Sequence, residues 1–127
     1  MPVSDDYRDF VLEQLAPAGR VTARAMFGGV GLYLDGLFCA LIDDDTLYFK
    51  ADQTTRARYE QAGSNQFCPF PDRPEPAMAY WQVPAEVLED TDALTVWAHE
   101  AMAVALAKRA RRPAGRRAPG PSRRKRR

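Results

Sequence analysis

The dipeptide Asp35-Gly36, set between two apolar runs, constrains this chain more than any other feature. An Asp-Gly pair is typical of a two-residue type I′ turn, because both central positions of that turn need a positive φ. The flanking runs therefore predict the two strands of a tight hairpin. Such a turn also fixes the register. The predicted cross-strand pairs are Leu34–Leu37, Tyr33–Phe38, Leu32–Cys39, Gly31–Ala40 and Val30–Leu41.

Both faces of this predicted hairpin are apolar. One face carries Val30, Leu32, Leu34, Leu37, Cys39 and Leu41, and the other carries Tyr33, Phe38, Ala40 and Ile42. A second turn at 43–46, centred on Asp44-Asp45, returns the chain as the strand Leu47–Lys50, with Leu47 and Phe49 beside Ile42 and Ala40.

The two faces need different partners. We expect helices to cover the face that holds Phe38, Leu47 and Phe49. The opposite face is more apolar than a solvated sheet face should be. We therefore expect it to meet either a helix of the same chain or a second copy, in a homodimer contact through Val30, Leu32, Leu37, Cys39 and Leu41.

The rest of the chain predicts elements around this hairpin. A first helix is capped by Ser4, has an apolar face of Tyr7, Phe10, Val11 and Leu15, and ends at Pro17 and Gly19. Further along we expect a strand at 21–26, a helix at 53–62 capped by Asp52 and closed by Gly63, a short strand at 65–70, a proline-rich loop at 69–76, a strand at 77–83, a helical turn at 85–88 and a helix from about 91 to 112, capped by Asp90 or Thr91. The stripe of the last helix is Leu94, Trp97, Ala98, Ala101, Val104 and Ala105.

These elements predict a two-layer α+β domain at 1–112, with helices packed mainly on one face of a curved antiparallel sheet. The predicted order is α-β-β-β-β-α-β-β-α. Residues 113–127 consist of Arg, Pro, Gly, Ala, Ser and Lys without an apolar anchor, which is typical of a disordered basic tail.

Charge is divided sharply along the chain. Of 18 basic residues, 11 fall within 108–127, where there is no acidic residue, so the first 107 residues hold 7 basic and 17 acidic residues, a net charge of −10. Flexible cations bind nucleic acid by releasing counterions, without reading sequence; the alternative is a solvated tail that touches the acidic body weakly. The candidate nucleic-acid contacts are Arg111, Arg112, Arg116, Arg117, Arg123, Arg124, Lys125, Arg126 and Arg127.

Other chemistry-bearing residues favour structural roles. The glycines at 28, 29 and 31 lack the spacing and the following helix of a phosphate loop, and suit a sharp turn instead. The lone His99 has no nucleophile or metal-ligand pattern around it, and the aspartates at 43–45 suit a solvated turn. Tyr80 and Trp81, with Met78, suit core packing because only Arg73 lies near them in the sequence. We therefore expect no catalytic residue, cofactor or metal.

The N-terminus and the cysteines together predict the cellular compartment of the protein. The acidic start of the chain lacks the apolar region of a signal peptide, and the sequence has no apolar run of membrane-spanning length. Cys39 and Cys68 have no closely spaced partner and suit buried thiols better than a disulfide. We expect a cytoplasmic protein that does not contact a membrane.

The run from Arg24 to Gly36, RAMFGGVGLYLDG, resembles the start of the TfoX/Sxy N-terminal domain. The resemblance continues through Phe38–Ile42, Leu47–Lys50, the residues at 78–84 and 88–90, and Trp97-Ala98, and covers about residues 7–108. Its structural signature is Met26, Phe27, Gly28, Gly29, Gly31, Tyr33, Asp35 and Gly36.

The resemblance implies a two-layer fold and a regulator of natural competence without catalytic residues. Members act with the cyclic-AMP receptor protein at competence promoters, and full-length members add a helical C-terminal domain where this chain continues into its basic tail. We therefore expect a non-enzymatic regulatory or interaction protein, whose partner is a transcription regulator and whose tail attaches to nucleic acid. The alternative is a small-molecule-binding or small enzymatic domain, supported by the glycine turn and the aromatic residues alone.

Overall fold

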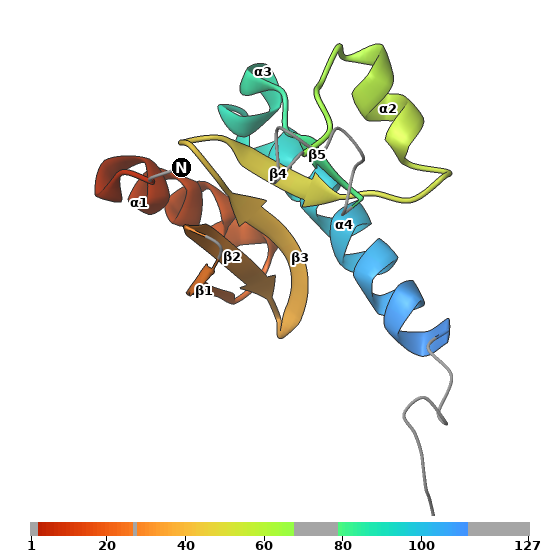
Figure 1. The fold of residues 1–127 in the computed structure, drawn as a ribbon, viewed down its shortest axis with the longest axis horizontal. Coiled ribbons are helices and arrows are strands. Elements are labelled where there is room, and N and C mark those ends of the chain that lie inside the picture. The colour runs from red at the N-terminus through yellow and green to blue at the C-terminus, as the bar shows by residue number, and fades with distance from the viewer. Residues whose placement is uncertain (1–2, 27, 68–78, 112–127) are drawn as a thin grey trace, which may run out of the picture.

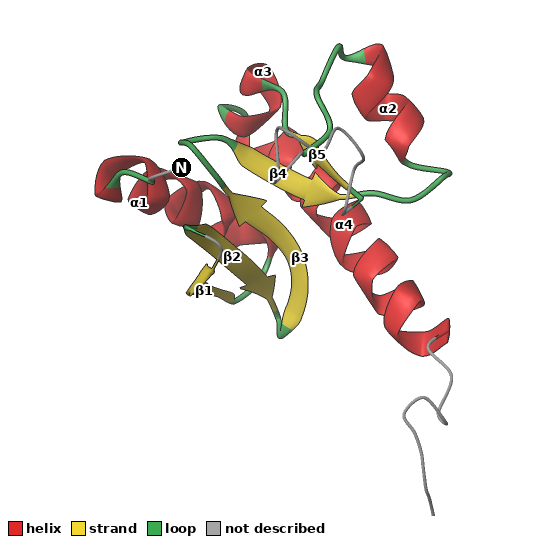
Figure 2. Ribbon diagram, in the orientation of Figure 1, coloured by secondary structure: helices red, strands yellow, loops and turns green. Residues whose placement is uncertain are grey.

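The computed structural model describes residues 3–26, 28–67 and 79–111. Five strands form one antiparallel sheet in the order β1-β2-β3-β4-β5. The elements are α1 (Asp5–Leu15), a 3₁₀ turn (Ala16–Ala18), β1 (Val21–Met26), β2 (Gly29–Leu34), β3 (Leu37–Ile42), β4 (Leu47–Lys50), α2 (Arg56–Gln61), β5 (Tyr80–Gln82), α3 (Ala85–Leu88) and α4 (Thr91–Arg111). Figure 1 shows the curved sheet in front of α1 and α4, and Figure 2 separates the helical layer from the strands by colour.

Helix α1 begins as predicted, and it ends at Leu15, from which a 3₁₀ turn leads to Gly19. The Ser4 hydroxyl accepts a hydrogen bond from the Tyr7 N–H, and Asp5 and Asp6 occupy the first turn, where the helix dipole favours anions. Val11 and Leu15 are buried, but Phe10 is 37% exposed, so its placement on the apolar face was wrong.

The hairpin turn is confirmed, with φ of 51° at Asp35 and 83° at Gly36. The predicted register holds for Leu34–Leu37 and Tyr33–Phe38 and is wrong beyond them, because Leu32 pairs with Ala40. Cys39 is the extra residue of a β-bulge, so it and Ala40 are both buried in the core beneath the helices. A bulge bends its strand and increases its twist, which agrees with the pronounced curvature of β3 in Figure 1.

The bulge redistributes the residues assigned to each face. Leu32 and Cys39 are fully buried in the core that α1 and α4 cover, and Val30 and Leu37 pack against that core. Leu41 belongs to a second cluster on the opposite face, which also takes Phe38. The five residues of the predicted homodimer contact therefore do not form one exposed face, and Phe38 does not lie on the face covered by helices. Homodimerisation itself stays a prediction.

The second turn has the predicted centre. Asp43 and Thr46 exchange two backbone hydrogen bonds of 3.0 Å, and Asp44 and Asp45 have φ of 52° and 50°. Helix α2 is shorter than predicted and begins at Arg56. The Asp52 carboxylate accepts hydrogen bonds from the backbone N–H groups of Thr54 and Thr55, which holds this segment as a turn before the helix. Gly63 follows the helix with φ of 78°, in the conformation of a glycine cap.

The later part of the chain confirms two helices and one strand. Asp90 caps α4 by accepting from the N–H groups of Asp92 and Ala93. The buried stripe of α4 is the predicted one, with Trp97 half-buried. Of the strand predicted at 65–70, the described part forms an isolated bridge between Gln66 and Trp81. Residues 68–78, which include the proline-rich loop and Cys68, and the tail from 112 onward lie outside the described residues.

The α+β fold class is confirmed, and the element order is α-β-β-β-β-α-β-α-α. Helix α4 contacts both α1 and α3, Gln14 of α1 donates a hydrogen bond to the Leu88 carbonyl of α3, and the three helices cover the same side of the sheet. Helix α2 is held against α4, where Arg58 forms a 2.7 Å ion pair with Glu100 and Tyr59 meets the edge of Trp97. The helix-covered core therefore lies on one side of the sheet, and the other side carries the residues described next.

Candidate nucleic-acid interface

The signature residues build the hairpin and its approach. The Asp35 carboxylate accepts a 2.8 Å hydrogen bond from the Arg20 N–H, while the Asp35 N–H donates to the Arg20 carbonyl. This pair ties the hairpin tip to the chain just before β1. Tyr33 stacks on Phe38 with their ring centroids 5.2 Å apart. Phe27 lies outside the described residues.

The glycines of the signature have three different steric roles. Gly28 has φ of 78°, in the region that favours glycine. A Cβ at Gly29 would collide with the backbone carbonyl oxygen of Ile42, and a Cβ at Gly31 would stand 2.5 Å from the Met26 Cε. The segment enters β2 and not a helix, so it lacks the helix N-terminus on which phosphate loops depend.

The remaining predicted candidates occupy structural positions. His99 is exposed on α4, with its Nε2 3.0 Å from the Ala18 carbonyl oxygen. Burial raises the pKa of the Cys39 thiol to about 12, which removes the thiolate needed for nucleophilic chemistry. Among the described residues, no group of three His, Cys, Asp or Glu side chains is placed to hold a metal ion.

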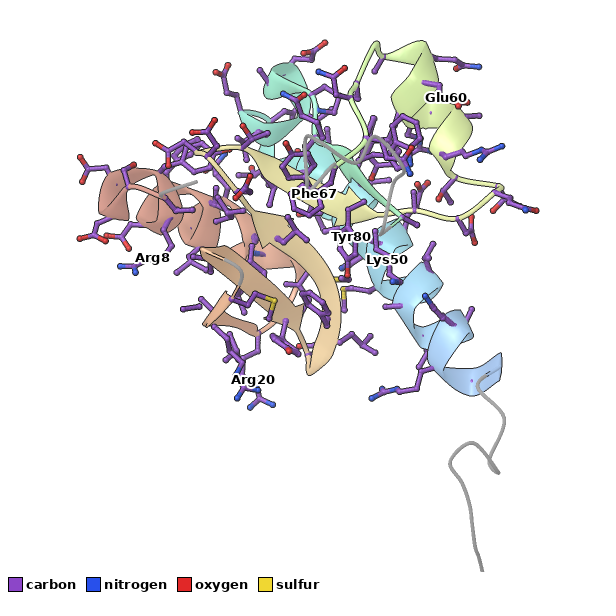
Figure 3. The ribbon with its side chains drawn as sticks, in the orientation of Figure 1. Arg8, Arg20, Lys50, Glu60, Phe67 and Tyr80 are labelled. Atoms are coloured by element: carbon purple, nitrogen blue, oxygen red, sulfur yellow. The ribbon has the colours of Figure 1, made fainter. Side chains whose placement is uncertain are left out.

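Aromatic side chains form a row on the sheet face that α1 and α4 leave uncovered. The Phe38 ring lies 5.2 Å from Tyr33 and 5.8 Å from Tyr80, measured between centroids. A cation lies at each end of the row, with Arg24 5.9 Å from the centroid of the Tyr33 ring and Lys50 Nζ 5.0 Å from that of the Tyr80 ring. Tyr80 is buried, so its predicted packing role is confirmed. Figure 3 shows Lys50 and Tyr80 next to each other.

A cavity of about 260 Å³ lies where the β2–β3 hairpin tip meets the C-terminal part of α4. Its apolar wall comes from the hairpin and its charged wall from β4 and α4. The residues that define it chemically are Tyr33, Leu37, Phe38, Lys50, Lys108 and Arg109.

Lys50 is the least solvated of the three cations at this cavity. Burial lowers its pKa, and the nearby positive charge of Lys108 lowers it further. No ion pair links Lys50, Lys108 or Arg109 to any carboxylate in the part of the chain that the structure describes. The cavity is therefore an electropositive hollow with an apolar wall, a combination that suits an anion bearing an organic group.

Reading the sequence alone missed this cavity. Basic residues are scarce near Tyr80 in the sequence, which disfavoured a nucleic-acid role for it, yet the fold places Lys50 over its ring. The only local signal was the position of Lys108 and Arg109 at the end of the predicted final helix. Of the predicted tail contacts, Arg111 ends α4 and the others lie outside the described residues.

Fold and site together define a small α+β domain built on a five-stranded meander, with an electropositive cavity beside its last helix. The chain belongs to the TfoX N-terminal domain family, whose model matches residues 13–105. The resemblance carried by the glycine-rich hairpin is thereby confirmed.

One curated relative is the DNA transformation protein TfoX1 of Aliivibrio fischeri, 39% identical over 49 residues. The match covers 39% of this chain and 23% of that protein. Its name describes that protein as a DNA transformation protein. Within the described ranges, the helices lack the combination of length and apolarity that crossing a bilayer requires.

Proposed function

We propose that this protein is a non-enzymatic regulatory module of DNA transformation or transcription, which acts through protein contacts and attaches to nucleic acid electrostatically. Membership of the TfoX N-terminal domain family supports the regulatory role, and the name of the Aliivibrio fischeri relative supports the link to DNA. A chain of this kind needs surfaces for partners and no reaction centre.

The observation that carries the proposal is the separation of charge. The acidic residues of α1 lie at one end of the molecule, whereas Lys108 and Arg109 lie on the last turns of α4, which lead into the basic residues from 111 onward. An acidic body repels a nucleic-acid backbone, so attachment should be confined to the end of α4 and the residues after it. Counterion release makes such attachment steeply dependent on salt and independent of sequence.

Binding to duplex DNA across a salt series tests this attachment. The informative variant is the full-length chain with the basic residues of 116–127 changed to glutamine. Each phosphate contact contributes about 0.9 to the slope of log K against log salt, so the variant should bind more weakly and with a much shallower slope. Equal affinity for the two proteins would contradict the attachment.

Charge loss elsewhere provides the control. Arg8 on α1 and Arg56 on α2 are away from the cavity, and Arg56 is exposed. Changing both to glutamine should leave the salt slope unchanged, because neither belongs to the basic C-terminal segment.

The regulatory contact needs a separate experiment. The family resemblance favours a transcription regulator as partner, with the cyclic-AMP receptor protein of the same organism as the first to test. Analytical ultracentrifugation of the two purified proteins, with cyclic AMP and promoter DNA, should reveal a complex that the glutamine variant still forms. Sedimentation as separate species would exclude this partner.

The cavity favours a second candidate function, a small-molecule-binding domain. Its volume of about 260 Å³ lies just below the range of about 300–1,000 Å³ that is usual for ligand pockets. Its three cations select anions. Titration with AMP, followed by a thermal shift, tests this candidate separately from DNA binding.

A further inference from the structure

The cavity beside α4 brings together cations from two elements that are distant in the sequence. Lys50 enters from β4, and Lys108 and Arg109 enter from the last turns of α4. A position in the last turn of a helix accounts for a cation on α4, since it complements the helix dipole. It does not account for Lys50, which is half-buried on a strand and directed to the same hollow.

The convergence of these cations costs stability unless an anion is present. Lys50 has the Tyr80 ring below its ammonium group, which offsets part of its desolvation. Its interaction with Lys108 is repulsive. Because none of the described carboxylates forms an ion pair with the three cations, a bound anion would relieve the repulsion and replace lost solvation.

The opposite wall of the cavity narrows the class of anion. Leu37 and Phe38 present apolar and aromatic surface from the hairpin, and Tyr33 lies beside them. A bare inorganic ion would leave this wall unused. A phosphate ester would place its charged oxygens against the lysines and its organic group against the hairpin, as nucleic-acid sites combine cations with aromatic surface.

Continuity with the basic segment identifies the source of the phosphate. The cavity lies at the end of α4, where the charge of the chain changes from acidic to basic. Because the basic residues from 112 onward follow α4 directly in the sequence, a nucleic-acid strand attached by them would be at high local concentration near this end of the helix. We propose that the cavity binds one phosphodiester of that strand, with Lys50 and Lys108 holding its oxygens and Phe38 contacting its sugar.

This inference rests on the proposed attachment to nucleic acid and adds a specific site in the folded domain. A free nucleotide offers the same phosphate chemistry, so AMP serves as a second probe. The experiment uses the full-length protein, with amide chemical shifts in ¹⁵N-edited NMR spectra as the readout, because these distinguish the cavity from the tail. The probes are a short DNA duplex and AMP, added separately.

We expect DNA to shift the amide signals of Gly36, Phe38 and Lys50. The Lys108→Gln variant should weaken the binding of DNA measured from these shifts by about threefold or more. It should also reduce the slope of log K against log salt by about 0.9, the contribution of one phosphate contact. Lys108 is exposed, so this substitution should leave the fold intact. Lys50→Gln should have a larger effect, and an unchanged set of core signals would show that it folds.

Arg8→Gln is the matched control. It also removes one positive charge, from α1, which Figure 3 places at the far side of the molecule from Lys50. It should leave the response of the cavity unchanged. If Arg8→Gln and Lys108→Gln weakened the response of the cavity signals to DNA equally, net charge alone would explain the effect. That result would overturn the site.

The remaining outcomes separate the two proposals. DNA binding that leaves the cavity signals unmoved would overturn the site while the attachment through the tail stands. Failure of DNA to bind at all would overturn the attachment. Shifts produced by AMP alone, and sensitive to Lys108→Gln, would then assign the phosphate to a free nucleotide and overturn the assignment to a strand.

Discussion

Replacing Gly29 by alanine tests whether the glycine-rich signature is needed for close packing of backbones. Gly29 is the first residue of β2 and pairs with Met26 of β1. Its φ is not in the positive region that favours glycine, so its backbone conformation suits alanine. A Cβ at this position would nevertheless collide with the Ile42 carbonyl oxygen, a backbone atom that cannot rotate away.

Two opposing terms set the size of the effect. Where the backbone conformation is compatible, changing glycine to alanine stabilises a protein by about 0.4–1 kcal/mol, because the unfolded chain loses freedom. Overpacking in a tightly packed structure costs about 1–3 kcal/mol, and more where the obstacle is rigid. We expect a net loss of about 2 kcal/mol in the free energy of unfolding, which lowers the Tm of a domain this size by about 10 °C.

Two other glycines serve as controls, because they separate collision from backbone strain. Gly36 and Gly63 have φ of 83° and 78°, and a Cβ at either would have no atom within 4 Å. Alanine there should cost about 1–2 kcal/mol through the left-handed conformation alone. Asparagine tolerates that conformation, so at Gly36 it should be better than alanine, whereas at Gly29 the larger side chain should be worse.

Urea unfolding and thermal melting of these variants provide the measurement. The reasoning would be refuted by a Gly29→Ala protein as stable as the original chain. It would also be refuted if alanine and asparagine had the same rank order at positions 29 and 36. The first result would mean that the β2–β3 backbones can separate without cost at Ile42, and the second that collision and backbone strain are not separated by these positions.

Three further predictions concern buried groups and the hairpin turn. No described residue is placed to hydrogen-bond the buried Tyr80 hydroxyl, so Tyr80→Phe should raise the free energy of unfolding by about 1 kcal/mol, while Tyr48→Phe, at a half-buried ring, should change it by less than about 0.5 kcal/mol. Because burial raises the pKa of Cys39 from 9.0 to about 12, its contribution to stability is fully present below pH 9 and is lost as the pH rises toward 12. In a Cys68→Ser protein, iodoacetamide should therefore label Cys39 at the rate of unfolding, and labelling as fast as that of a free thiol would contradict its burial. Asp35→Ala should lower the free energy of unfolding, measured by urea titration, by about 1–2 kcal/mol, because it removes the acceptor of the Arg20 N–H and forces alanine into positive φ. Asp35→Asn should retain most of the original stability.

The two hairpin turns were predictable because their chemistry is local. The central positions of both turns have a positive φ, and Asp35-Gly36 and Asp44-Asp45 consist of the few residue types that tolerate it. Each turn fixes its two strands as neighbours, and together the turns define β2, β3 and β4. Most of the sheet order therefore follows from four residues.

The bulge at Cys39 could not be predicted from local turn chemistry. A turn fixes the pairs next to it, but the register farther along depends on which face is buried. Because both faces of this hairpin are apolar, a register shift of one residue neither exposes nor buries a polar side chain. Only the packing of α1 and α4 against Leu32 and Ala40 distinguishes the two arrangements, and that packing is a property of the whole fold.

The cavity was unpredictable for a different reason, since its parts come from separate elements. Lys50 ends β4, whereas Lys108 belongs to α4. Each residue has an ordinary local explanation, as a charged strand end or as a cation in the last turn of a helix. Only their convergence indicates a ligand, and it depends on the angle at which α4 crosses the sheet.

The signature residues and the cavity share one hairpin but make separable contributions. Gly36 and Phe38 belong to the turn and strand that line the cavity, so any change that moves the hairpin must also move its apolar wall. The lysines contribute charge from β4 and α4, which are separate elements from the hairpin. A family member with the glycine signature but without both lysines should therefore keep this fold and fail to bind the proposed phosphodiester, which DNA titration followed by amide chemical shifts would test.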